Sequence, residues 1–333
     1  MKLISAILIL TYSLHCFSQA SNTPVIEDAL HAFQFIEGKV TDHGDTIAYF
    51  LKKYKEKPQN LVVFIQGSDA NPVFTYEIKN GKTNFYRWFA DDYKLLDSTY
   101  AFAIVPKPGM DGLYIEHNWS VPEEYYRKNY LDYRVKQIDL SIDDIIKNHL
   151  QNPKDIIVYG HSEGAAIAAA VATKNKHITH LGFWSGNVLN NFYEFALFDR
   201  IEALQGHQTD SAANQNIMNI INWYKEVIRE PNSTAVDKFG VTNKRWASYE
   251  TPPIDYLLRV DIPIFAQFAT EDESTPIETA YLLPIRFLEY QKDNLTFNVC
   301  VNCDHSYKEK KGEDVINHWP EIFRKFIEWT KNN

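Results

Sequence analysis

The sequence lacks several features that would assign it to a specialised class of protein. Cysteine is rare, with 3 residues among 333, so a disulfide framework of the kind that stabilises miniproteins is excluded. Positive charge is in deficit, because 34 Lys and Arg face 43 Asp and Glu and the net charge is −9. Since an acidic surface repels phosphate groups, we predict that the protein binds neither nucleic acid nor anionic membranes.

The rest of the composition is close to that of an average globular protein. Hydrophobic residues make up 45% and charged residues 23%, which excludes a disordered, collagen-like or coiled-coil chain. At roughly 100–200 residues per domain, the length fits one large domain or two ordinary ones. Aromatic residues are frequent, at 14%, and favour a large core and a pocket lined by rings.

Long apolar runs are absent beyond the N-terminus, so we expect no membrane-spanning segment in the mature protein. Residues 3–14 are apolar but too few to span a bilayer, and Lys2 precedes them. Ser18 and Ala20 put small residues where signal peptidase reads the chain. We therefore predict that residues 1–20 are a cleaved signal peptide and that the protein is secreted or periplasmic. A hydrophobic first helix of the domain is the alternative.

Apolar strands alternate with amphipathic helices along most of the chain. Continuous apolar runs such as 61–66 and 100–105 are typical of strands buried on both faces of a sheet. Repeated alternation predicts an α/β fold with a mostly parallel sheet flanked by helices. The expected strands are 33–40, 46–51, 61–66, 100–105, 155–159, 180–184, 264–268 and 295–301, and the expected helices are 84–96, 135–146, 163–173 and 319–327.

Residues 186–260 interrupt this alternation. The segment is too long for a plain connection, has helical character and is rich in aromatic residues. We predict one domain over residues 21–333, with residues 186–260 inserted as a helical cap that forms one wall of the pocket.

The predicted strand 155–159 runs directly into a chemical motif. The motif has the form G-x-S-x-G and reads Gly160-His161-Ser162-Glu163-Gly164. A strand before it and an Ala-rich helix after it are what a nucleophile elbow requires. In such an elbow Ser162 adopts strained backbone angles, and Gly160 and Gly164 let strand and helix approach closely. The alternative is an ordinary turn in which the serine only caps a helix.

A nucleophilic serine needs a base and an orienting acid. The predicted strand 264–268 is followed by the segment Ala269-Thr270-Glu271-Asp272, and Pro276 comes four residues later. This segment resembles the G-T-x-D-x-x-x-P turn of the α/β-hydrolase superfamily, with Ala in place of the usual Gly. The resemblance implies that Asp272 is the acid, and Glu271 and Glu273 are the nearby alternatives.

The predicted base follows the last strand. Asp304-His305 stands just beyond residues 295–301 and resembles the histidine loop of the same superfamily, which implies that His305 is the general base. Cys300 and Cys303 precede it and either form a disulfide or remain free thiols. The two cysteines could also bind zinc together with His305, but no fourth ligand lies nearby in the sequence. We predict no metal and no cofactor, because no glycine-rich nucleotide-binding motif is present either.

Two backbone N–H groups must stabilise the oxyanion of the tetrahedral intermediate. One belongs to Glu163, the residue after the nucleophile. The other should come from the loop after the strand 61–66, which reads Gln66-Gly67-Ser68, and the resemblance implies the N–H of Ser68. The superfamily often has His-Gly there, so Gln66 is a departure.

The resemblance covers about residues 33–331. It is nearest to secreted hydrolases of the dienelactone-hydrolase and prolyl-oligopeptidase-like groups. It implies a serine hydrolase that cleaves an ester or amide bond of a small-molecule substrate through an acyl-enzyme. The alternatives are a peptidase acting on short peptides, an enzyme that transfers the acyl group to an acceptor other than water, and a catalytically inactive binding module on the same fold.

Overall fold

The computed structural model describes residues 23–52, 54 and 58–333. The predicted signal peptide, residues 1–20, lies outside the described residues. Among the described residues, no helix combines the length and the apolar character needed to cross a membrane.

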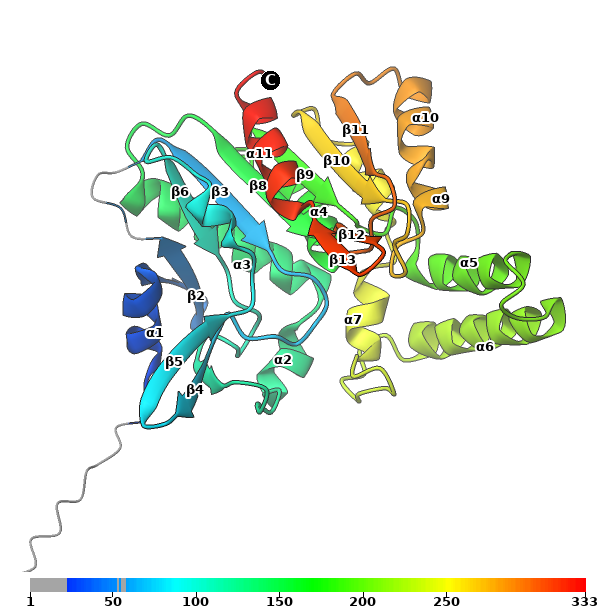
Figure 1. Cartoon of the computed structure of the whole chain (residues 1–333), viewed down its shortest axis with the longest axis horizontal. Helices are drawn as coiled ribbons and strands as arrows, with labels where there is room; N and C mark the ends of the chain where they lie inside the picture. The colour runs from blue at the N-terminus through cyan, green and yellow to red at the C-terminus, as the bar shows by residue number, and fades with distance from the viewer. Residues whose placement is uncertain (1–22, 53, 55–57) are drawn as a thin grey trace, which may run out of the picture.

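The core of the molecule is an eight-stranded sheet in the order β1-β2-β6-β3-β8-β9-β10-β11 (Figure 1). β2 runs antiparallel to its neighbours β1 and β6, and the strands from β6 to β11 are parallel. The mostly parallel sheet is thus confirmed. The strands are β1 (Phe35–Asp42), β2 (Asp45–Lys52), β3 (Asn60–Ile65), β6 (Tyr100–Ile104), β8 (Ile156–His161), β9 (His180–Trp184), β10 (Ile264–Ala269) and β11 (Leu295–Cys300).

Helices cover both faces of this sheet. In β3, Val63 packs into the core on one face and Val62 into the core on the other, as the alternation of side chains along a strand requires. The first face is covered by α3 (Leu131–His149), α4 (Glu163–Lys174), α8 (Pro253–Leu257), α9 (Ile277–Ala280) and α10 (Leu282–Glu289). The second face is covered by α1 (Ile26–Phe33) and α11 (Trp319–Thr330).

The prediction of a helix over residues 84–96 is wrong. This part of the chain forms β5 (Lys82–Arg87) and a short 3₁₀ helix, η1 (Asp91–Lys94). β5 pairs with β4 (Phe74–Lys79) across Asn80-Gly81, whose φ angles are 53° and 71°. Asn-Gly with two positive φ angles is the preferred two-residue hairpin turn, so this dipeptide favours two strands over a helix in this part of the chain.

Four further elements lie outside the large sheet. β7 (Leu113–Ile115) joins β4 and β5 in a small separate sheet, and α2 (Glu123–Lys128) follows it. Between β11 and α11 the chain forms the hairpin of β12 (Lys308–Lys311) and β13 (Asp314–Asn317), which the sequence did not predict.

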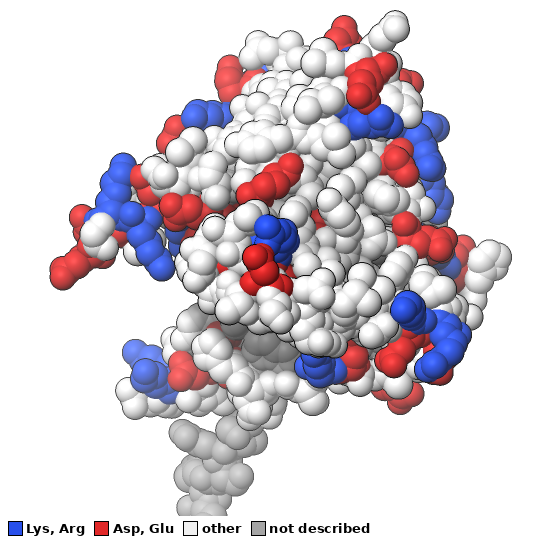
Figure 2. Space-filling view, turned by 90° about the vertical axis from the view of Figure 1, so that its right-hand side faces the viewer, with Lys and Arg blue, Asp and Glu red and all other residues white. Residues whose placement is uncertain are grey.

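The segment between β9 and β10 is helical, as the sequence predicted. It contains α5 (Asn191–Leu204), α6 (Asp210–Arg229), α7 (Asn243–Ser248) and α8. α5 and α6 pack side by side and project from the body of the molecule, whereas α8 lies in the core against α4 (Figure 1). On the side where α5 and α6 project, Figure 2 shows acidic and basic side chains in small groups with uncharged surface between them.

Candidate active site

Ser162 stands at the junction of β8 and α4 with a strained backbone. Its φ is 58° and its ψ is −129°, an uncommon conformation for a residue with a side chain. A Cβ at Gly160 would lie 2.0 Å from the Gly164 oxygen, and one at Gly164 would lie 2.1 Å from the Ile65 oxygen. Because neither contact is possible, this turn requires glycine on both sides of the serine.

Asp272 and His305 come together as the sequence proposed. The Nδ1 atom of His305 is 2.9 Å from Oδ1 and 2.8 Å from Oδ2 of Asp272. Asp272 is buried at the end of β10, whereas its neighbours Glu271 and Glu273 are exposed. The structure therefore places one of the three clustered carboxylates, Asp272, against the histidine.

The surroundings of Asp272 keep it ionised. Burial alone would raise its pKa, but the hydrogen bond from His305 and those from Thr275 and the Ser274 N–H outweigh burial and hold the pKa below its ordinary value. Thr275 donates from its hydroxyl at 2.7 Å and from its N–H at 2.8 Å, and the Ser274 N–H donates at 2.8 Å. A fixed, charged carboxylate can orient an imidazole and stabilise its protonated form.

His305 lies beside the elbow because His161 supports it. The two rings pack with their centroids 4.5 Å apart, and Nε2 of His161 is 2.8 Å from the His305 carbonyl oxygen. Burial, together with the proximity of His305, lowers the pKa of His161 to about 4, so His161 is neutral and donates Nε2–H to that carbonyl. In the sequence His161 was only a variable position of the motif, and this supporting contact was not foreseen.

The loop that carries His305 is also tied to the turn that carries Asp272. Cys300 and Cys303 form a disulfide. The Cys303 carbonyl accepts the Glu271 N–H at 2.9 Å, and the Cys300 carbonyl accepts the Thr270 N–H at 3.1 Å. His318, rather than His305, has a ring nitrogen within 4.8 Å of both sulfur atoms, so the zinc ligand set considered from the sequence is not the one brought together.

The loop after β3 approaches the nucleophile closely. A Cβ at Gly67 would lie 3.1 Å from the Ser162 Cβ and 3.6 Å from its Oγ. Ser68 follows Gly67 directly, and Glu163 follows Ser162 as the first residue of α4. The backbone groups predicted to bind the oxyanion therefore lie on the two segments that meet at Ser162.

The described residues also include three buried cations that the sequence did not predict, and two of them, Lys107 and Arg245, bond to carbonyls of this loop. Arg245, Arg134 and Lys107 are each at most 4% exposed. Burial, followed by the charge of Arg134, lowers the pKa of Lys107 to about 7. Arg245 forms an ion pair with Glu163. No sequence motif includes these residues. They become notable only once the fold is known, because buried cations are rare in proteins.

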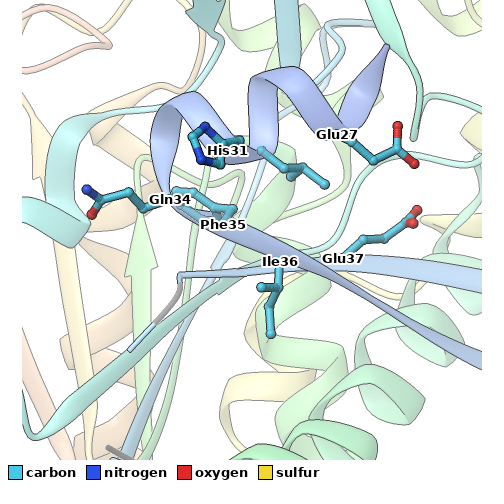
Figure 3. Close-up of a pocket in the computed structure, with 7 residues that line it drawn as sticks. Glu27, His31, Gln34, Phe35, Ile36 and Glu37 are labelled. Atoms are coloured by element: carbon cyan, nitrogen blue, oxygen red, sulfur yellow. The ribbon is translucent and has the colours of Figure 1, made fainter. Parts of the chain in front are cut away.

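A hollow of about 430 Å³ lies elsewhere, between α1 and β1 (Figure 3). None of the predicted site residues lines it. Its lining consists of Glu27, Leu30, His31, Gln34, Phe35, Ile36 and Glu37.

Comparisons with known proteins identify the fold. No family model and no curated protein matches the sequence. Among solved structures, the chain is similar to acylaminoacyl peptidase of Pyrococcus horikoshii (TM-score 0.56, 13% identity), covering 90% of this chain and 41% of the peptidase chain. It is similar to an esterase of Pyrococcus furiosus (TM-score 0.51, 11% identity, 92% and 90% covered) and to Est1E of Butyrivibrio proteoclasticus (TM-score 0.51, 13% identity, 89% and 99% covered).

These neighbours settle the architecture. The chain has the α/β-hydrolase fold, and the resemblance seen in the motifs is confirmed at that level. The names esterase and peptidase belong to the neighbours, and at this identity they carry no activity over to this chain.

Proposed function

We propose that the protein is a serine hydrolase that cleaves ester bonds. The observation that carries the proposal is a strained Ser162 at the end of β8 together with the hydrogen-bonded pair His305–Asp272, whose histidine packs on the residue before the serine, His161. An ordinary βα turn has no need for a strained serine next to a histidine that a buried carboxylate orients.

The chemistry follows from these positions. The Ser162 Oγ attacks the carbonyl carbon of the substrate, and His305 accepts the hydroxyl proton at Nε2, the ring nitrogen that Asp272 does not bind. Asp272 stabilises the imidazolium, and the N–H groups of Ser68 and Glu163 stabilise the oxyanion. His305 then protonates the leaving alcohol. Water, deprotonated by His305, attacks the acyl-enzyme and releases the acid.

Ester cleavage is preferred over peptide cleavage because of chain coverage. The chain covers most of the two esterases but only 41% of the acylaminoacyl peptidase. Cleavage of short peptides remains the second candidate, because the peptidase has the higher TM-score, 0.56.

A substrate screen separates the two candidates. The purified protein is assayed with p-nitrophenyl acyl esters of two to twelve carbons and with aminoacyl-arylamides, with Ser162→Ala as the matched control. We expect turnover of at least one ester class, absent in the variant. Turnover of arylamides alone would assign a peptidase, and no turnover of either class would contradict the proposed function.

We also propose that residues 1–20 are removed on export. Mass spectrometry of the protein isolated from its native compartment should give a mature chain that begins at Ser21. A chain that retains Met1 in the cytoplasm would contradict secretion.

A further inference from the structure

One buried side chain bridges the two residues that supply the proposed oxyanion N–H groups. Arg245, on α7 of the cap, donates from Nε at 2.9 Å and from Nη2 at 2.5 Å to Oε2 of Glu163. The same Nη2 donates to the Ser68 carbonyl oxygen at 3.1 Å. Because Arg245 is 4% exposed, this bridge lies inside the protein.

Tyr125 of α2 completes the bridge. Its hydroxyl accepts a hydrogen bond from Nη1 of Arg245 at 3.2 Å and donates to the Ser68 carbonyl at 3.3 Å. The Ser68 carbonyl therefore accepts two hydrogen bonds from buried side chains. This fixes the peptide plane that follows Ser68.

The next two carbonyls of the loop are held in the same way. Lys107 donates from Nζ to the Asp69 carbonyl, and Trp119 donates from Nε1 to the Ala70 carbonyl at 3.0 Å. Three consecutive carbonyls, at residues 68, 69 and 70, are thus anchored by side chains from separate parts of the chain. On the other side of Ser68, Gly67 is packed against Ser162.

Lysine could not replace the arginine in this position. A guanidinium presents several donors in a planar fork, whereas an ammonium is a single point charge on a flexible stem. The fork lets Arg245 contact a carboxylate and a backbone carbonyl at the same time. In addition, loss of the cation would leave the Glu163 carboxylate, whose side chain is only 12% exposed, without its ion-pair partner.

We propose that Arg245 is a positioning residue of the oxyanion hole. It holds Ser68 and Glu163 in a fixed relation, so that their N–H groups converge on the oxyanion, and it does not itself touch the substrate. The inference rests on the proposed function. It assigns to the cap a part in transition-state stabilisation, beyond the pocket wall that the sequence predicts.

The test compares Arg245→Met with Arg229→Met, which removes an exposed arginine of the same cap. For the best p-nitrophenyl ester, we expect Arg245→Met to lower kcat about 10- to 100-fold with KM within about threefold, because displacing a donor costs somewhat less than deleting one. The inhibition constant of a trifluoromethyl ketone, which forms an oxyanion adduct with the serine, should rise by the same factor. Arg229→Met should match the wild type in kcat, in KM and in the inhibition constant of the ketone.

More conservative substitutions test the same inference if Arg245→Met does not fold. Tyr125→Phe removes one of the two bonds to the Ser68 carbonyl and should lower kcat about threefold. Arg245→Lys should lower kcat nearly as much as Arg245→Met, because the fork is lost. In a double-mutant cycle, Glu163→Gln and Arg245→Lys should be less than additive in kcat.

Three results would overturn the inference. If Arg245 only anchors the cap, the variants will lower the melting temperature or raise KM while kcat and the ketone inhibition constant stay unchanged. Equal kinetics for Arg245→Lys and wild type would also contradict it. Absence of ester turnover in the wild type would overturn the proposed function, and this inference with it.

Discussion

The elbow around Ser162 and the cap formed by α5, α6 and α7 are built in different ways. At the elbow, small residues bring strand and helix into contact, and two alanines in the first turn of α4, Ala165 and Ala166, are at most 6% exposed. In the cap, α6 has 20 residues but buries only Ala213 and Val227. The shape of the elbow is therefore set by close packing of the backbone, whereas the cap is held together by contacts between a few large side chains.

Aromatic rings hold the cap together. The ring of Phe192 on α5 is 4.7 Å from Trp223 on α6 and 5.7 Å from Trp246 on α7, measured between centroids. Trp246 follows Arg245 directly, so the same rings that join α5 to α7 also help to position the arginine. The outer side of α6 leaves Met218, Ile221 and Ile228 exposed at the surface.

The two parts of the proposed active site, the triad and the oxyanion loop, therefore rest on two kinds of structure. The proposed nucleophile ends β8, and the proposed acid and base lie in the loops that follow β10 and β11, where the hydrogen bond between His305 and Asp272 holds them together. The oxyanion loop depends in part on Arg245, which the cap supplies. Changes at the strand ends should therefore abolish turnover, and changes in the cap should reduce it.

The largest effect is expected at the nucleophile. Ser162→Ala should lower kcat on the order of 10⁴- to 10⁶-fold, because no other group can form the acyl-enzyme. The melting temperature should change by less than about 3 °C, since the turn and its glycines are retained. Steady-state kinetics and thermal unfolding followed by circular dichroism provide the check. Activity within tenfold of the wild type would remove Ser162 from the mechanism.

The acid should come next. Asp272→Asn should lower kcat about 10⁴-fold, because an amide cannot stabilise the imidazolium and can favour the wrong tautomer. Glu271→Gln is the matched control, one residue away and exposed, and should keep activity within about twofold. A larger loss for Glu271→Gln than for Asp272→Asn would show that the acid turn is assigned one residue out of register.

A buried carboxylate beneath the elbow should make stability depend on pH. Asp92 accepts hydrogen bonds from Tyr159 and Trp319, and burial raises its pKa to about 7. Since the unfolded value is near 3.9, the Asp92 carboxyl binds more protons in the folded state between these values, and its contribution to stability falls as pH rises from 4 to 7. Glu194, at the start of the cap, is buried with a pKa of about 7 and acts in the same direction.

Urea unfolding at pH 5 and pH 7 measures this effect. Over that interval the wild type should lose about 2 kcal/mol more unfolding free energy than Asp92→Asn, and this difference isolates Asp92 because the lowered pKa of His161 acts in the opposite direction in both proteins. Asp91→Asn, at an exposed neighbouring position, should behave as the wild type. A wild type that loses no more unfolding free energy than Asp92→Asn between pH 5 and pH 7 would contradict the prediction.

The disulfide should have the smallest effect. The Cys300–Cys303 bond closes a very short loop, so it contributes little to stability through chain entropy. The backbone carbonyls of Cys300 and Cys303 accept hydrogen bonds from the turn that carries Asp272. Reduction or Cys303→Ser should therefore misplace the His305–Asp272 pair and lower kcat about tenfold. The melting temperature should fall by no more than about 4 °C. Unchanged kcat after reduction, verified by mass spectrometry, would separate the bond from catalysis.

The elbow could be predicted from sequence because its constraints are local. Two glycines, a serine and an apolar strand lie within ten residues, and steric limits at Gly160 and Gly164 leave few other structures for that pattern. Asp272 and His305 could be proposed because each follows a strand whose end lies at the same edge of the sheet.

Contacts that join distant parts of the chain could not be predicted. Arg245 and Glu163 are 82 residues apart, and nothing near either residue in the sequence indicates that they pair. The support of His305 by His161 joins residues 144 apart and has no sequence pattern either. The helix wrongly expected over 84–96 is a different case, because Asn80-Gly81, with its two positive φ angles, is a local sequence signal for the hairpin found there.

The central claim is that Ser162 is an activated nucleophile oriented toward an acyl substrate. The most direct test is labelling of the native protein with a fluorophosphonate probe, followed by intact-mass analysis and peptide mapping. We predict one probe per chain, attached to Ser162, with labelling lost in His305→Ala and in heat-unfolded protein. Absence of labelling in folded wild-type protein, or attachment at another serine, would contradict the account.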